Sequence, residues 1–104
     1  AQGYFEQALA LTRETGERQA EGCAAGNIGR AHDEQGRPQE ALKWYEVALK
    51  IAREVQNVEG EAVSLGNMST ACRALGRSRE ADSYFEQAAQ IFLKLRRVPF
   101  HSSW

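Results

Sequence analysis

A five-residue segment occurs twice in the chain, and a close variant lies halfway between the two copies. Residues 4–8 read Tyr-Phe-Glu-Gln-Ala, residues 84–88 are identical, and residues 44–48 read Trp-Tyr-Glu-Val-Ala. Further identities follow the same spacing of 40 residues: Gly26/Gly66, Asn27/Asn67, Ala31/Ala71, Gly36/Gly76, Arg37/Arg77, Glu40/Glu80 and Ala41/Ala81. An internal repeat of this length predicts a solenoid, in which each unit stacks on its neighbours.

Charge and cysteine usage restrict the classes of partner. The chain has 104 residues, enough for one domain or part of one, and its 13 basic and 14 acidic residues are interspersed. A clustered basic face is absent, so we expect no nucleic-acid partner. No apolar run approaches the roughly 20 residues of a membrane span, and we expect no membrane partner. Cys23 and Cys72 show no Cys-x-x-Cys spacing, which favours reduced thiols and a cytoplasmic location.

Apolar residues between positions 41 and 52 recur at steps of one, three and four, the pattern of one helix face. Gly36 and Gly76 stand where helices would end in a left-handed residue, and Pro38 stands where the next helix would begin. The sequence predicts about five helices without strands, at 1–15, 18–35, 38–56, 58–75 and 78–97, with turns at Gly16, Gly36, Asn57 and Gly76. Pro99 is expected to stop the last helix and leave residues 98–104 as a tail.

The order of small and aromatic residues resembles the tetratricopeptide repeat. In one copy the pattern falls on Ala25, Ile28-Gly29, His32, Gly36, Ala41, Tyr45 and Ala48. In the next it falls on Leu65, Met68-Ser69, Cys72, Gly76, Ala81, Phe85 and Ala88. His32 and Cys72 replace the usual Tyr, and Ser69 replaces the usual Gly. The resemblance covers residues 1–97 and implies an all-α, right-handed solenoid of antiparallel helical hairpins.

The 40-residue unit, with Gly-Asn-Ile-Gly-Arg-Ala at 26–31 and Gly-Asn-Met-Ser-Thr-Ala at 66–71, resembles the Leu-Gly-Asn repeat branch of G-protein signalling modulators. The diagnostic triplet is Ile28-Gly29-Arg30 in one copy and Met68-Ser69-Thr70 in the other. Kinesin light chains share the lengthened unit. By repeat register, we expect residues 1–15 to be the second helix of a truncated unit, and 18–56 and 58–97 to be complete units. We expect Gly29 to permit a close helix contact, and Tyr45 and Phe85 to fill the space between hairpins.

The resemblance implies a concave surface lined by the first helix of each unit. There Asn27 and Asn67 would bind the backbone of a peptide, because a carboxamide both donates and accepts hydrogen bonds. Gly26 and Gly66 would leave room for it. The predicted peptide-binding residues are Cys23, Gly26, Asn27, Arg30, Glu34, Val63, Gly66, Asn67, Thr70 and Arg73. The alternative is that the asparagines are tolerated surface residues and the glycines serve packing.

Arg30 and Arg73 could contact carboxylates of a partner or pair with Glu34 of the same chain. Because the surface is mixed in charge, we expect an internal mixed or acidic segment as ligand, rather than a clamped carboxyl terminus. The implied function is a non-enzymatic protein-protein interaction scaffold.

A second function class is a structural module that self-associates or packs on other domains. Two complete hairpins are fewer than the three units a solenoid normally needs, so exposed end faces could be covered by another copy in a homodimer. The apolar residues for such contacts are Phe5, Leu9, Ile91, Phe92 and Leu95, with Val98, Phe100 and Trp104 of the tail.

Catalytic chemistry has little support in the sequence. His32 lies nine residues after Cys23, more than about 13 Å along a helix, too far for a Cys/His pair. His32 and Cys72 share a repeat position, but two ligands do not make a zinc site. No glycine-rich loop follows a strand. We therefore expect neither an enzyme nor a bound metal or cofactor.

Overall fold

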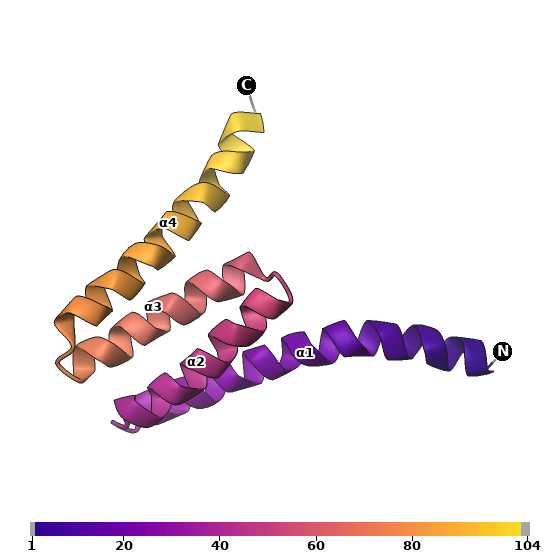
Figure 1. The fold of residues 1–104 in the computed structure, drawn as a ribbon, viewed down its shortest axis with the longest axis horizontal. Helices are drawn as coiled ribbons and strands as arrows, with labels where there is room; N and C mark the ends of the chain where they lie inside the picture. The colour runs from indigo at the N-terminus through magenta and orange to yellow at the C-terminus, as the bar shows by residue number, and fades with distance from the viewer. Residues whose placement is uncertain (1, 103–104) are drawn as a thin grey trace.

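Four helices follow one another in the computed structural model, which describes the backbone of residues 2–102 and the side chains of residues 16–96 (Figure 1). They are α1 (Gln2–Glu34), α2 (Pro38–Glu54), α3 (Val58–Ala74) and α4 (Ser78–Ser102). No strand occurs in the described backbone. The predicted all-α array of antiparallel hairpins is confirmed.

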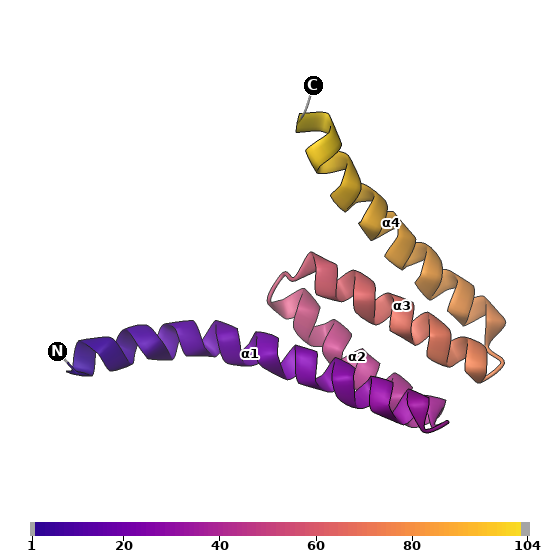
Figure 2. The ribbon, with the colours of Figure 1, turned by 180° about the vertical axis from the view of Figure 1, so that it is seen from behind.

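Each helix packs against the next one in the chain, and α1 also touches α3. Two hairpins, α1–α2 and α3–α4, are therefore stacked through α2 and α3. In both ribbon views the N-terminal part of α1 and the C-terminal part of α4 extend beyond this packed region (Figures 1 and 2). Within the described residues, none of the helices has the length and hydropathy of a membrane-spanning segment.

The three turns between helices are built alike. In each turn an amide reaches back five residues to a helix carbonyl, and these bonds, all 2.8 Å long, run from Arg37 to His32, Asn57 to Ala52 and Arg77 to Cys72. A left-handed residue precedes each donor: Gly36 (φ 78°), Gln56 (φ 57°) and Gly76 (φ 79°). The predicted left-handed glycines are confirmed, whereas the left-handed Gln56 carried no sequence signal.

The predicted turn at Gly16 is wrong, because α1 continues through it. Position 16 is the repeat equivalent of Gln56, so a turn is geometrically possible there. The difference lies one residue later. Asn57 caps α3 by accepting a hydrogen bond from the amide of Gly60 at 3.0 Å. Glu17 stands at the equivalent position, and Glu is not among the residues that cap a helix N-terminus well. Without a new helix start, one helix replaces the two expected at 1–15 and 18–35.

The predicted stop at Pro99 is also wrong, since α4 runs to Ser102. A proline removes a single backbone donor, and only three helical residues follow it. Its missing donor leaves one carbonyl, that of Leu95, without its helical partner, and this loss lies within the last two turns of α4.

The core is centred on Tyr45, which is only 1% exposed and packs against Gly29 of α1. A Cβ built on Gly29 would lie 2.6 Å from the Tyr45 ring, so the predicted close contact at this glycine is confirmed. The Tyr45 hydroxyl donates a hydrogen bond to Asp33 at 3.2 Å. Burial, followed by the charge of Asp33, raises the pKa of Tyr45 to about 12.

Phe85 does not repeat the role of Tyr45, contrary to expectation: its side chain is 61% exposed. Ser69 replaces Gly29 in the second hairpin and donates a hydrogen bond to the Ala81 carbonyl at 2.7 Å. Because a Cβ at Gly29 would overlap the Tyr45 ring, a side chain at the equivalent position 69 leaves no room for a ring packed in the same way. Phe85 is thus excluded from the interior of its own hairpin.

Candidate functional site

A groove of about 360 Å³ lies between α1 and α3, with α2 as its floor. The floor is formed by the buried side chains of Ala48, Ile51 and Ala52, with the half-buried Val55 at its end. One wall is formed by Gln19, Gly22, Cys23, Gly26, Asn27 and Arg30, and the other by Asn57, Glu59, Gly60, Val63, Ser64 and Asn67. The groove therefore has an apolar floor and largely polar walls.

Six of the ten predicted peptide-binding residues line this groove: Cys23, Gly26, Asn27, Arg30, Val63 and Asn67. The other four lie outside it: Glu34, Gly66, Thr70 and Arg73. The Thr70 hydroxyl bonds the Gly66 carbonyl of its own helix at 3.2 Å, and Arg73 lies 3.6 Å from Asp82 of α4. Both polar side chains are thus engaged within the chain.

Asn27 and Asn67 lie on opposite walls of the groove. Asn27 is exposed and Asn67 is half-buried. Neither carboxamide has a hydrogen-bond partner among residues 16–96, so the donors and acceptors of both remain available.

The glycines of α1 differ in their surroundings. A Cβ on Gly26 would meet no atom within 4 Å, whereas one on Gly22 would lie 3.0 Å from the Cγ2 of Ile51. Close packing therefore accounts for Gly22, as it does for Gly29, but not for Gly26. Gly26 faces the open volume of the groove.

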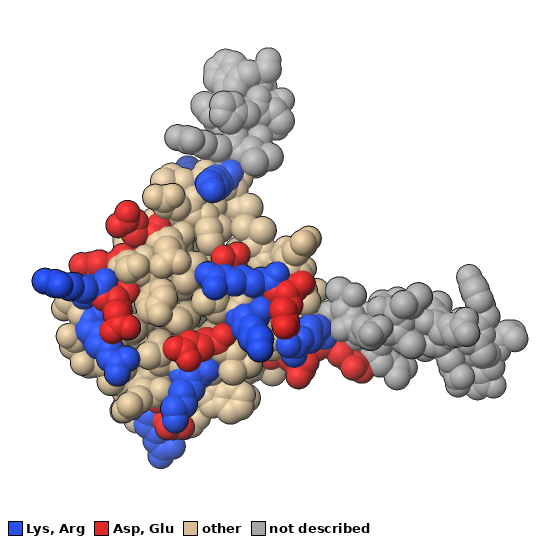
Figure 3. Space-filling model, viewed as in Figure 1, with Lys and Arg blue, Asp and Glu red and all other residues tan. Residues whose placement is uncertain are grey.

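The groove is mixed in charge. Arg30 contributes a positive charge and Glu59 a negative one. Arg30 makes no ion pair with any residue in 16–96, Glu34 included, so its guanidinium is available. Figure 3 shows basic and acidic side chains interspersed over one face of the molecule, without a continuous patch of either sign.

Sequence reasoning missed the contribution of α2 to the groove. Ile51 was assigned no role, although it recurs as Ile91 in the next unit. That recurrence marks an apolar position of the repeat, and the buried Ile51 forms part of the floor. Only the packing of α2 beneath both walls shows that its side chains reach the groove.

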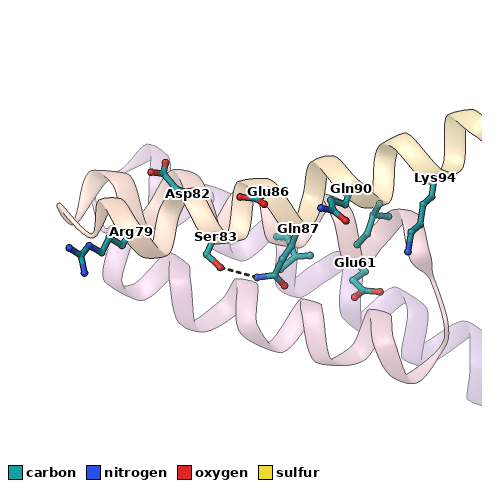
Figure 4. Close-up of a pocket in the computed structure, with 10 residues that line it drawn as sticks. Glu61, Arg79, Asp82, Ser83, Glu86, Gln87, Gln90 and Lys94 are labelled. Carbon is teal, nitrogen blue, oxygen red and sulfur yellow. Dashed lines mark hydrogen bonds between the residues drawn. The ribbon is translucent and has the colours of Figure 1, made fainter.

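A second hollow, of about 670 Å³, lies along α3 and α4. Figure 4 shows Arg79 toward one end, Glu61 and Lys94 toward the other, and Ser83 and Gln87 between them. The Gln87 carboxamide donates a hydrogen bond to the Ser83 hydroxyl at 3.3 Å. Most of the lining residues are charged or carry amide groups, so this hollow is more polar than the groove between α1 and α3.

The residues considered for catalysis or metal binding are not assembled. Cys23 is exposed and Cys72 is buried, and burial raises the pKa of the Cys72 thiol. The Nδ1 atom of His32 is buried without a partner. Within the described part of the chain, no three His, Cys, Asp or Glu residues come together with the geometry of a metal site.

The residues predicted for self-association fall at both ends of the molecule. The side chains of Phe5 and Leu9 lie outside the described residues. Ile91 is half-buried and packs against the core, whereas Phe92 and Leu95 are 42% and 37% exposed. At least these two present apolar surface to solvent.

Two family models match the chain, both described as tetratricopeptide repeat. One covers residues 1–54 and the other residues 64–96. No curated protein and no solved structure gives a match.

Proposed function

The chain belongs to the tetratricopeptide repeat family, whose members generally act as non-enzymatic protein-interaction scaffolds, and from that premise we propose that its groove binds an extended peptide segment of a partner protein. The single observation that carries the proposal is the pair of carboxamides, Asn27 and Asn67, which stand unpartnered on facing walls of one groove. Each can satisfy both an amide and a carbonyl of a peptide backbone, whatever the peptide's side chains.

The surroundings of the two asparagines suit an extended backbone. Gly26 presents no side chain beside Asn27, so a peptide can approach the helix closely there. The apolar floor of Ala48, Ile51 and Ala52 would accept a small apolar side chain. Binding then combines backbone hydrogen bonds at the walls with burial at the floor.

The charged residues set the ligand class. The unpaired guanidinium of Arg30 favours a carboxylate in the peptide, and Glu59 on the other wall favours a basic residue elsewhere in it. We therefore assign a mixed or acidic segment. The 40-residue unit and the segments at 26–31 and 66–71 support placing the chain in the Leu-Gly-Asn branch, although Arg30 and Thr70 replace the asparagine of that motif. The two free cysteines support a reducing, cytoplasmic setting.

A random-peptide display selection on the purified chain tests the proposal. We expect a motif that is enriched on the parent chain and lost on an Asn27→Ala/Asn67→Ala variant that circular dichroism shows to be helical. The matched control is Gln87→Ala/Gln90→Ala, which removes two carboxamides from the hollow along α3 and α4. This control should retain the motif.

Two outcomes would contradict the proposal. Enrichment that is lost on the glutamine variant and kept on the asparagine variant would move the ligand to the second hollow. No enrichment on the parent chain would mean that this groove does not bind peptides. The family's general role in protein interaction would still stand.

A further inference from the structure

One face of α1 is exposed where its repeat equivalent on α3 is buried. Ile28 is 39% exposed, whereas Met68, 40 residues later, is 2% exposed. Ala31 is exposed, whereas Ala71 is fully buried. We call this surface the open face of α1, and its residues are Ala24, Ile28 and Ala31.

The repeat shows what covers this face in the second unit. On α3 the face is covered by α2, whose Tyr45 and Leu49 belong to the same buried cluster as Leu65 and Met68. The chain contains a second α2-like segment, residues 2–15, with Phe5 and Leu9 at the repeat positions of Tyr45 and Leu49. That segment is the N-terminal part of α1 itself, so it does not fold back onto the open face of its own chain.

We propose that two copies of this chain associate through antiparallel α1 helices about a two-fold axis near Gly16, so that residues 2–15 of each copy cover the open face of the other. The occupant of the open face is thus a second copy.

The register follows from the hairpin already present in the chain. The α2 and α3 helices are antiparallel about a turn at Gln56, and Gly16 is its repeat equivalent. Tyr45 and Met68 belong to one buried cluster, and their repeat equivalents 40 residues earlier are Phe5 and Ile28. Two continuous α1 helices that cross antiparallel at Gly16 would bring these equivalents together twice, as a two-fold interface requires.

A charge pair supports the same register. In the structure, Arg53 of α2 and Glu61 of α3 are joined at 3.1 Å. Both residue types recur 40 positions earlier, as Arg13 and Glu21. Within one straight helix these two lie eight residues, or about 12 Å, apart along the axis, too far to pair. In the proposed dimer, Arg13 of each copy would lie beside Glu21 of the other copy, so the ion pair would form twice.

Glu21 is accessible for this contact. Its side chain is 62% exposed, and its present partner is Arg18 of the same helix turn, at 3.0 Å. The open face is also separate from the groove, because Ala24, Ile28 and Ala31 do not line it. Each copy in the dimer therefore keeps its own groove.

Light scattering on the full chain over a concentration series is the first test. We expect twice the chain mass of 11.6 kDa, and an Ile28→Glu variant that remains helical should be monomeric. Phe92→Glu, on the exposed face of α4, is the matched control and should leave the dimer intact. A parent chain that stays monomeric overturns the proposal, as does a dimer abolished by Phe92→Glu and retained by Ile28→Glu.

Charge reversal tests the register. Arg13→Glu or Glu21→Arg alone should weaken association by about tenfold, because the two-fold axis makes each change act at two contacts. The double variant should restore the parent affinity. Failure of the double variant to recover would contradict the antiparallel register.

Gly16→Ala distinguishes the proposed dimer, in which α1 is continuous, from a monomer in which residues 2–15 fold back onto the rest of α1. In a continuous α1, alanine raises helix propensity, so the melting temperature should rise and the mass should remain that of a dimer. In a fold-back turn, position 16 would take the left-handed conformation of Gln56, and alanine would lower the melting temperature. A lower melting temperature together with a monomeric mass would overturn the proposal.

Discussion

At the scale of single residues, three glycines of one helix have three different surroundings. Gly29 lies under the Tyr45 ring, Gly22 lies beside Ile51, and Gly26 faces open volume. The repeat pattern predicted the close approach at Gly29, because a small residue is required where two helices meet. It could not predict the exposure of Phe85, which depends on the serine that replaces that glycine in the second hairpin.

Gly29→Ala and Gly26→Ala should change stability in opposite directions. At Gly29 the added methyl overlaps the ring of Tyr45, and the overpacking should lower the free energy of unfolding by about 1–3 kcal/mol. At Gly26 the methyl meets nothing within 4 Å, and the gain in helix propensity should raise it by up to about 1 kcal/mol. Urea denaturation of both variants measures the two changes in the free energy of unfolding. A stabilising change at Gly29 would mean that the two helices are further apart than described.

Tyr45 should weaken the fold at alkaline pH. Its pKa is raised from 10.0 to about 12, so between these values the unfolded chain loses a proton that the folded chain keeps. The contribution to stability is complete below pH 10 and is lost as pH rises through 12, by roughly 2 kcal/mol. The measurement is the free energy of unfolding from pH 9 to 12. In Tyr45→Phe this component of the decline should be absent, and an unchanged slope would contradict the assignment.

At the scale of helices and turns, local signals determined most boundaries. Pro38 and Ser78 begin helices as predicted, and Gly36 and Gly76 end them. The turn at Gln56 departs from this pattern, since a non-glycine residue there takes a left-handed conformation. The hydrogen bond from the Asn57 amide and the side-chain cap of Asn57 hold it in place.

Exchanging glutamine and glycine between the turns at positions 56 and 36 tests the cost of a left-handed residue that is not glycine. Gln56→Gly should raise the free energy of unfolding by about 0.5–1 kcal/mol, because glycine adopts a positive φ without steric cost. Gly36→Gln should lower it by a similar amount, since Gly36 has φ 78° and no crowding at its Cβ position. Thermal denaturation measures both. A Gln56→Gly variant that is less stable would show that the glutamine side chain itself contributes to the turn.

The sequence predicted helix type and packing order better than helix ends. Gly16 and Pro99 both look like breaks, yet each lies within one continuous helix. Position 17 has neither the side-chain cap that Asn57 gives α3 nor a proline like the one that begins α2, and α1 continues through Gly16. In the candidate site, repeat register identified both walls of the groove, whereas the floor from α2 depends on how three helices pack together.

At the scale of the whole molecule, burial is concentrated in the middle of the array. Among residues 16–96, the four largest fully buried side chains all belong to α2 and α3: Tyr45, Leu65, Met68 and Cys72. These two helices have neighbours on both sides, whereas α1 and α4 each form one end. Stability in such an array is carried by the contacts between adjacent elements.

Amide hydrogen exchange should show this gradient. We expect the slowest exchange in α2 and α3, and faster exchange at residues 94–96 of α4, whose side chains are exposed. Thiol labelling gives an independent measure, because the exposed Cys23 should react at once and the buried Cys72 only after opening. Equal protection of α3 and the end of α4 would contradict the gradient.

The exposed Phe85 and Phe92 on α4 also bear on how such a chain can lengthen. Their repeat equivalents on α2, Tyr45 and Ala52, are buried. Joining a further copy of residues 57–96 after Arg96 would add one more junction of the kind that α2 makes with α3. Growth of this kind is additive: each added unit covers the apolar surface left by the last and exposes a similar one. Stable arrays of this kind should therefore differ in length by whole units of 40 residues.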